Sequence, residues 1–99
     1  MKTVIEELNK AFESRIRLGI MSVLVVNESS DFNTLKAQLN ITDGNLSSHI
    51  TALEKLQYLK VKKQFIGKKP KTIYLINAAG RKAFASHLDA LEKLIRQSI

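Results

Sequence analysis

The amino-acid sequence predicts a mainly helical (α+β) domain with one small β-hairpin, in the order α-α-α-α-β-β-α. Apolar residues recur at helical spacing from the N-terminus to about residue 56. From Leu59 to Ile76 the pattern changes to short β-branched and aromatic runs separated by Gly and Pro. Helical spacing then returns in one long final segment. With 99 residues, the chain has room for a single domain, residues 1–99.

Two helices are expected before residue 27. Thr3 and Glu6 form a capping-box pattern at the start of the first helix. The apolar positions of this helix are Val4, Ile5, Leu8, Ala11 and Phe12. Ser14 can cap the second helix, which runs from Arg15 to about Val26. Its wide apolar face, typical of a central core helix, comprises Ile16, Ile20, Met21, Leu24 and Val25.

A short helix and a tight turn are expected next. Residues 27–31 are a polar break, after which Asn33 can cap a helix from Thr34 to Leu39. Residues 40–42 then form a three-residue turn. A further helix starts after this turn.

This fourth helix, capped by Thr42 or Asp43, has two contrasting faces. Its apolar residues have the 4-3-3 spacing of a buried stripe and are Leu46, Ile50, Leu53 and Leu56. At about 100° per residue, the opposite face presents Gly44, Asn45, Ser48, Thr51 and Lys55. Two short helices joined by a tight turn, the second with a small polar outer face, form the layout of a helix-turn-helix.

The hairpin and the last helix complete the chain. One strand is expected from Leu59 to Ile66 and another from Thr72 to Ile76, with residues 67–70 as the turn. Asn77 can cap a helix that covers about residues 78–98. A coiled-coil-like seam with 4-3-4 spacing follows this helix at Phe84, Leu88, Leu91 and Ile95. Because one small core cannot cover this seam, we expect a homodimer through the last helix, aided by the first.

The charge of the chain is concentrated in the hairpin. Sixteen Lys and Arg residues against nine Asp and Glu give a net charge of +7. Between residues 60 and 71 there is no acidic residue, and the lysines there are Lys60, Lys62, Lys63, Lys68, Lys69 and Lys71. A basic segment of this kind favours a polyanionic partner, most often a nucleic acid.

Composition and motifs exclude several classes of function. The chain has no cysteine, which excludes disulfides and thiolate chemistry. Two histidines far apart, scattered carboxylates and no Gly-rich phosphate loop argue against an enzyme, and no cofactor is expected. The longest apolar stretch, from Leu18 to Val26, is too short to cross a bilayer. Since residues 1–10 contain acids where a signal peptide needs a positive flank, we expect a cytoplasmic protein without membrane contact.

The order of elements is that of a winged helix-turn-helix domain, and the residues resemble the small winged-helix transcriptional regulators related to the ArsR and MarR groups. The similar stretches are residues 32–39, 41–50, 53–59, 65–75 and 79–84. Thr-Asp-Gly-Asn-Leu-Ser-Ser-His from residue 42, together with Gly-Lys-Lys-Pro-Lys-Thr from residue 67, is the specific combination. The resemblance implies a regulator that binds double-stranded DNA as a homodimer.

For such a regulator, the fourth helix would enter the major groove. The candidate contacts on it are Thr42, Gly44, Asn45, Ser47, Ser48, His49, Thr51 and Lys55. Asn45 can pair with adenine, Ser48 and Thr51 can hydrogen-bond to bases, and Gly44 lets the helix N-terminus approach a phosphate. The alternative is an ordinary solvated helix face, but the preceding turn and the basic hairpin favour DNA contact. His49 lies at the edge of the buried stripe, where packing and base contact are equally open.

The hairpin lysines can neutralise phosphates without sequence preference. The candidates are Lys63, Lys68, Lys69 and Lys71, with the last three placed at the tip. Lys60 and Lys62 lie near the hairpin base, where a purely solvated role fits better. A winged helix used for protein–protein contact, or as a subunit of a larger assembly, is the alternative function, because a fold does not fix a function.

Two positions depart from the family pattern. Gln57 stands where the family often has Gly, so the helix end needs another geometry or a strained positive φ. Of the Asp and His pairs of zinc-sensing members, only His87 and Asp89 remain, so no metal site is expected. No convergent polar cluster marks a small-molecule pocket, and the sequence leaves an effector open.

Overall fold

The computed structural model of the chain describes residues 3–97. Its elements are α1 (Val4–Glu7), the 3-10 helix η1 (Lys10–Glu13), α2 (Arg15–Asn27), β1 (Ser29–Asp31), α3 (Phe32–Leu39), α4 (Asp43–Lys55), β2 (Leu59–Ile66), β3 (Lys69–Ile76) and α5 (Ala78–Gln97). The predicted class, mainly helical with one hairpin and a long last helix, is confirmed. The expected helix end at Ser98 lies outside the described residues.

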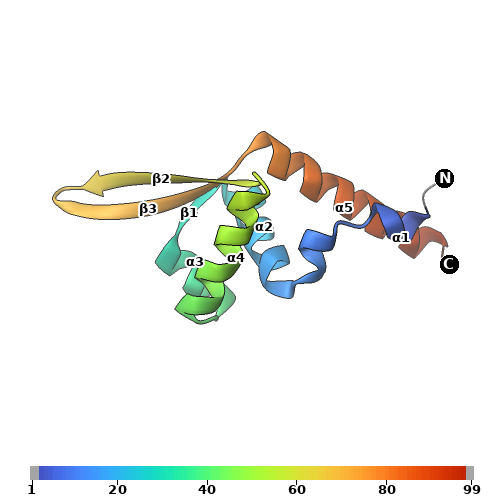
Figure 1. Cartoon of the computed structure of the whole chain (residues 1–99), viewed down its shortest axis with the longest axis horizontal. Coiled ribbons are helices and arrows are strands. Elements are labelled where there is room, and N and C mark those ends of the chain that lie inside the picture. The colour runs from blue at the N-terminus through green and yellow to red at the C-terminus, as the bar shows by residue number, and fades with distance from the viewer. Residues whose placement is uncertain (1–2, 98–99) are drawn as a thin grey trace.

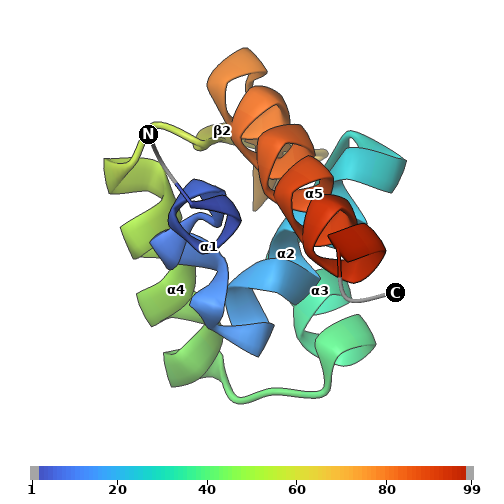
Figure 2. The ribbon, with the colours of Figure 1, turned by 90° about the vertical axis from the view of Figure 1, so that its right-hand side faces the viewer.

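The molecule is elongated, with extents of 55 × 25 × 21 Å. The β2–β3 hairpin projects from one end, and α1 packs along α5 at the other (Figure 1). Helices α2, α3 and α4 form the part between them (Figure 1), and α1 and α5 face the viewer when the molecule is seen along its long axis (Figure 2). The hairpin tip and the free end of α5 are therefore separate surfaces.

The segment before α2 is not the single helix that its apolar spacing predicts. Thr3 does cap α1, but the helix ends at Glu7. The side-chain oxygen of Asn9 then accepts a hydrogen bond from the N–H of Ala11 at 2.9 Å and starts η1. Because η1 starts here as a separate helix, the predicted single helix is interrupted. The side chain of Phe12 then enters the core and is 1% exposed.

A third strand, β1, occupies the polar segment where only a break was predicted. It pairs antiparallel with β3, giving the sheet order β1-β3-β2, with Ser30 opposite Tyr74. The carboxylate of Asp31, at the end of β1, accepts a hydrogen bond from the N–H of Thr34 at 2.7 Å and caps α3. The predicted cap at Asn33 is therefore wrong, and α3 begins two residues earlier than expected.

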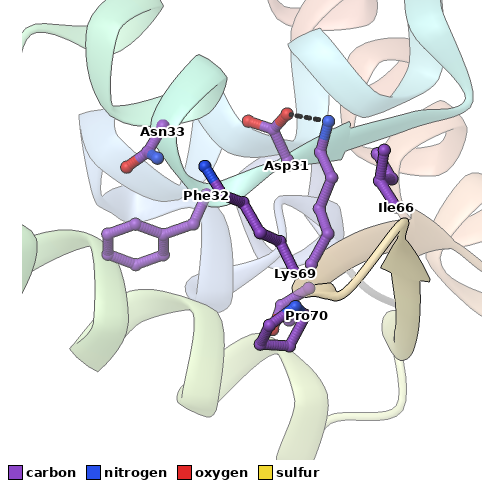
Figure 3. A pocket seen from close by; sticks show the side chains of 8 residues that line it. Asp31, Phe32, Asn33, Ile66, Lys69 and Pro70 are labelled. Atoms are coloured by element: carbon purple, nitrogen blue, oxygen red, sulfur yellow. Dashed lines mark ion pairs between the residues drawn. The ribbon is translucent and has the colours of Figure 1, made fainter.

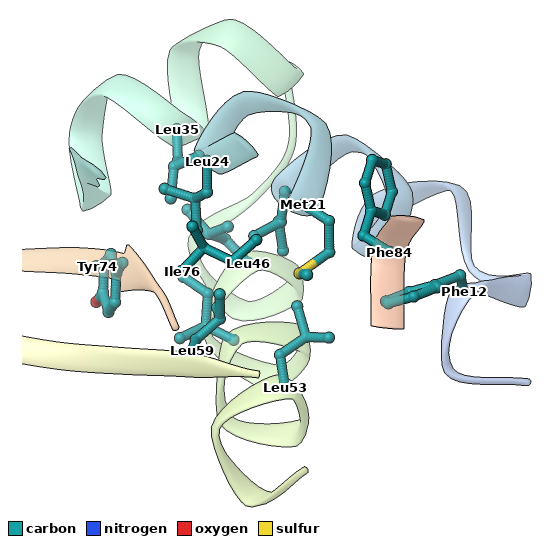
Figure 4. Packing of buried hydrophobic residues seen from close by; sticks show 12 residues of the cluster. Phe12, Met21, Leu24, Leu35, Leu46, Leu53, Leu59, Tyr74, Ile76 and Phe84 are labelled. Atoms are coloured by element: carbon teal, nitrogen blue, oxygen red, sulfur yellow. The ribbon is translucent and has the colours of Figure 1, made fainter. Parts of the chain in front are cut away.

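The core lies where α2, α3 and α4 meet the base of the hairpin (Figure 4). Its most deeply buried side chains are Phe12, Ile20, Met21, Leu24, Leu35, Leu46 and Leu53. Of the four inward positions predicted on α4, three are buried, but Leu56 is 44% exposed. The helix ends at Lys55, and Leu56 already belongs to the turn that leads into β2. The predicted burial of Leu56 is wrong for that reason.

The start of α5 is fixed against the junction between α4 and β2. Asn77 caps the helix as predicted, because its side-chain oxygen accepts a hydrogen bond from the N–H of Gly80 at 2.9 Å. The backbone N–H of Asn77 donates to the carbonyl oxygen of Tyr58 at 3.1 Å. A Cβ on Gly80 would collide with that same carbonyl oxygen. Only glycine allows the helix to approach this closely.

The inner face of α5 joins the core through an aromatic and hydrogen-bonded cluster. The ring of Phe84 packs edge-on against Phe12, with 5.7 Å between centroids. The Nδ1 atom of His87 accepts a hydrogen bond from the N–H of Asn9 at 3.0 Å. The side chain of Asn9 in turn donates to the Tyr58 hydroxyl at 3.1 Å. Burial lowers the pKa of His87, which favours the neutral ring that this acceptor role needs.

Phe84 is therefore part of this domain's own core, with 6% of its side chain exposed. Its predicted place in a dimer seam is wrong. The 4-3-4 spacing could not show this, because the burial of Phe84 depends on the distant residue Phe12.

Candidate nucleic-acid interface

Helix α4 presents a small polar face to solvent. The hydroxyl of Thr42 accepts a hydrogen bond from the N–H of Asn45 at 3.2 Å, so Thr42 rather than Asp43 is the cap. The predicted contact residues that remain exposed are Thr42, Gly44, Asn45, Ser47, Ser48, Thr51 and Lys55. No atom lies within 4 Å of the position that a Cβ on Gly44 would take, so the start of α4 is open to a ligand.

His49 differs from its neighbours on α4. It is half-buried, and its Nδ1 atom accepts a hydrogen bond from the Nε–H of Arg17 on α2 at 3.0 Å. Burial, followed by the nearby guanidinium of Arg17, lowers the pKa of His49. The hydrogen bond between Arg17 and His49 holds α4 against α2. Of the two roles considered for His49, packing and base contact, this geometry supports packing.

The turn between α3 and α4 has the predicted length of three residues. Asn40 ends α3 in the left-handed conformation, with φ 52° and ψ 54°, a region that Asn tolerates better than most residues. Lys36 and Asp43 form an ion pair across the turn at 2.7 Å. These features orient α4 relative to α3 as one unit.

The end of α4 forms a Schellman motif without glycine. The N–H of Gln57 donates to the carbonyl of Glu54 at 2.9 Å, and the N–H of Tyr58 donates to that of Leu53 at 3.0 Å. Gln57 takes the left-handed position, with φ 64°. Of the two alternatives at this departure from the family pattern, another geometry or a strained positive φ, the structure has the positive φ.

Replacing Gln57 by Gly should stabilise the fold. Glycine adopts a positive φ without the steric cost that a Cβ adds, and the gain exceeds the extra entropy of the unfolded chain. We expect the Gln57→Gly variant to gain about 1 kcal/mol in free energy of unfolding, measured by chemical denaturation. A Gln57→Ala control keeps the Cβ and should show no comparable gain. A variant with glycine that is less stable than the wild type would contradict this account.

The hairpin turn is tighter than the sequence indicates. β2 and β3 pair in register up to Ile66 opposite Lys69, which leaves only Gly67 and Lys68 as the turn. Gly67 has φ 65°, as a two-residue hairpin turn needs at this position. The prediction that Lys69 and Pro70 belong to the turn is wrong, because both are already in β3.

The hairpin lysines divide into one paired residue and a free group. The ammonium group of Lys71 lies 3.1 Å from the carboxylate of Asp31. The N–H of Thr34, followed by the Lys71 ammonium, holds the pKa of Asp31 below its ordinary value. Within residues 3–97, no carboxylate forms an ion pair with the other hairpin lysines: Lys60, Lys62, Lys63, Lys68 and Lys69. Lys71 is thus not a tip residue, contrary to prediction, and fastens the hairpin to the start of α3.

A crevice of about 430 Å³ separates the hairpin from α3 (Figure 3). Its lining residues are Asp31, Phe32, Asn33, Ile66, Lys69, Pro70, Lys71 and Thr72. The ion pair between Asp31 and Lys71 crosses it, and apolar side chains form much of the remainder (Figure 3). The residues beyond this ion pair, from Phe65 to Pro70, are all exposed.

The outer face of α5 carries the rest of the predicted dimer seam. Leu88, Leu91 and Ile95 are 46%, 43% and 56% exposed. Ile5 on α1, which packs along α5, is 68% exposed. His87 points inward instead, toward Asn9, and within the described part of the chain no three His, Asp or Glu side chains are grouped as metal ligands.

Sequence reasoning missed three residues that shape this surface. Arg17 holds His49, and Asp31 both caps α3 and binds Lys71. Phe65, at the hairpin tip, is 73% exposed, and the sequence predicts only a strand position for it. The contacts of Arg17 with His49 and of Asp31 with Lys71 join segments far apart in the chain, so no local pattern shows them, whereas the cap that Asp31 supplies to Thr34 is local. An apolar residue inside a lysine-rich hairpin was the available signal for Phe65.

A helix-turn-helix whose second helix is exposed, followed by a basic hairpin and a long helix, defines the winged helix class. The chain belongs to the winged helix DNA-binding domain family, whose model matches residues 16–95. Membership in a DNA-binding family supports a DNA-binding regulator and favours a non-enzymatic role. The resemblance to winged-helix transcriptional regulators stated from the sequence is confirmed.

Individual relatives agree with this assignment. The chain is 40% identical over 79 residues to an uncharacterised protein of Methanocaldococcus jannaschii, covering 80% of this chain and 86% of that protein. It is similar to the structure of a transcriptional regulator homologue from Pyrococcus horikoshii, with 33% identity, a TM-score of 0.78, and coverage of 93% and 96%. BpsR of Bordetella bronchiseptica, at 10% identity and TM-score 0.73 over 95% of this chain and 71% of its own, shares the fold.

Within residues 3–97, no helix has the length and apolar character that crossing a membrane requires.

Proposed function

We propose that this chain is a transcriptional regulator that binds specific sequences in double-stranded DNA as a homodimer. Helix α4 reads bases in the major groove, and the β2–β3 hairpin contacts the phosphate backbone. The similarity to the regulator homologue of Pyrococcus horikoshii supports the regulatory role.

One observation carries the proposal: the exposed polar face of α4 leads directly into a projecting hairpin with five unpaired lysines among the described residues. Small amide and hydroxyl side chains are suited to base edges, and ammonium groups to phosphates. Asn45 and Ser48 have no ion-pair or packing role within the domain, since both are exposed. A helix face that only contacts water needs neither small amide and hydroxyl side chains nor a basic hairpin next to it.

The dimer is proposed from the outer face of α5. Leu88, Leu91 and Ile95 form an apolar stripe that the domain leaves about half uncovered. An isologous contact between two such stripes would bury them and would relate the two α4 helices by a two-fold axis. Two-fold symmetry predicts an inverted-repeat site with half-sites about 34 Å apart.

The variants Asn45→Ala and Ser48→Ala test the assignment of α4. Both positions are exposed, so stability should change by less than about 0.5 kcal/mol. Each lost base contact should reduce discrimination between sites by roughly 1–3 kcal/mol. The measurement compares affinity for a duplex selected from a random pool with affinity for its scrambled version.

The expected result is weaker binding to the selected duplex alone, with non-specific affinity and salt dependence preserved. Ser22→Ala on α2, an exposed position outside the helix-turn-helix, is the matched control. Equal losses on both duplexes would show that these residues grip only the backbone. No shift of any duplex at low salt would favour a protein–protein role for the domain.

A further inference from the structure

The hairpin tip carries large apolar side chains that the domain does not cover. Phe65 is 73% exposed and Ile66 is 57% exposed. Both lie at the end of β2, where the hairpin projects away from the helices (Figure 1). Exposed apolar groups gathered at one place mark a contact surface more often than single ones do.

Strand register distributes this apolar surface over both faces of the hairpin. Phe65 lies opposite Pro70, and Ile66 lies opposite Lys69. Since successive residues of a strand point to opposite faces, Phe65 and Pro70 share one face and Ile66 lies on the other. The tip wedge, defined as Phe65, Ile66 and Pro70, is therefore a thin ribbon with apolar groups on both sides.

Positive charges surround the tip wedge. Lys68 is one of the two turn residues, Lys69 follows it, and Lys63 precedes Phe65 by two residues on the same face. These lysines are exposed and have no ion-pair partner in residues 3–97. A partner that fits this tip has a narrow groove with apolar walls and negatively charged edges.

The DNA minor groove has this form: it is about 6 Å wide, deoxyribose rings line its walls, and phosphates follow its edges. We propose, on the basis of the function proposed above, that the tip wedge enters the minor groove and partly unstacks a base step there. Phe, Ile and Pro are side chains that other DNA-bending proteins use for this purpose. Phe65 supplies the main wedge, and Lys68 and Lys69 hold the phosphates on either side.

This arrangement makes the hairpin a second source of sequence preference. Flexible pyrimidine–purine steps are unstacked more easily than stiff A-tracts. A dimer with two hairpins should therefore bend its site at two symmetric steps outside the α4 half-sites, and should select deformable steps there without reading their base edges.

The test uses the full chain and a duplex selected for binding. The variants are Phe65→Ala and Phe65→Leu, with Val26→Ala on α2, 80% exposed, as the matched control. Because all these side chains lie largely on the surface, thermal unfolding should not change. The readouts are the bend angle from end-to-end energy transfer, the fluorescence of 2-aminopurine placed through the flanking steps, and affinity.

The wild-type complex is expected to bend DNA within the range of about 20–90° and to raise 2-aminopurine fluorescence at one step per half-site. Phe65→Ala should abolish that fluorescence gain, reduce the bend, and weaken binding roughly tenfold without changing the salt dependence. Phe65→Leu, which keeps an apolar wedge, should retain most of the bend.

Bending and fluorescence that are the same in wild type and Phe65→Ala would overturn the wedge and leave the proposed function standing. Absence of DNA binding by the wild type would overturn both. A change of oligomeric state in Phe65→Ala, with bending unchanged, would assign the tip to a contact between copies and also overturn the wedge.

Discussion

The double variant Lys68→Ala, Lys69→Ala is expected to bind every duplex more weakly and to depend less on salt. Both lysines are exposed at the hairpin tip, and neither has an ion-pair partner within residues 3–97. Each phosphate that a lysine neutralises releases counterions, which makes log K fall with log salt by about 0.9 per contact. A dimer would lose up to four contacts, so the slope should become smaller by about 3 to 4.

The measurement is fluorescence anisotropy over a range of salt concentrations, on a selected duplex and on its scrambled version. The loss should be equal on both, because phosphate contacts carry no sequence information. The matched control is Lys60→Ala, Lys62→Ala, which removes the same charge near the hairpin base, opposite Leu75 and Ile73. The slope of log K against log salt should change much less in this control than in the tip variant. An unchanged slope in the tip variant would show that the hairpin points away from DNA.

The lysine variants and the Phe65 variants are expected to change different measured quantities. Removing ammonium groups changes the salt slope, because counterion release depends on charge alone. Removing the ring of Phe65 changes bending and base stacking, because an uncharged side chain releases no counterions. A variant that changes both observables would show that the charged and the apolar groups of the hairpin do not act independently on DNA.

Local signals predicted most of the fold. Capping at Ser14, Thr42 and Asn77 depends on a side chain and an N–H three residues away, so a short stretch of sequence contains both partners. The change from helical to strand periodicity also located the hairpin, because this pattern is likewise contained in neighbouring residues. The exposed face of α4 also followed from spacing alone, because Leu46, Ile50 and Leu53 face the core as predicted.

Features that depend on distant partners were not predictable in this way. β1 is three residues of polar sequence, and only its pairing with β3 makes it a strand. Phe84 had the spacing of a seam, but the ring of Phe12, more than seventy positions earlier, buries it. Lys71 looked like a tip residue until β1 placed Asp31 beside it. In each case a tertiary contact overrode what the local pattern predicted.

The Leu91→Asp variant is expected to be a folded monomer with greatly reduced affinity for an inverted-repeat site. Leu91 lies between Leu88 and Ile95 on the outer face of α5 and is 43% exposed in the single chain. An aspartate there remains solvated in the monomer, but it would be buried without a partner between two copies of α5. Sedimentation at micromolar concentration measures the association, and circular dichroism checks that the helix content is kept.

Loss of the dimer should affect DNA binding more than any single contact on α4. Two linked half-site interactions exceed one alone by roughly 100-fold or more, because the second binding step is intramolecular. The monomer should therefore bind a lone half-site as the wild type does and lose its preference for the inverted repeat. Ser86→Asp adds the same charge about 140° around the helix and should leave the dimer intact. A wild-type chain that sediments as a monomer would contradict the dimer, and the preferred site would then be a single half-site.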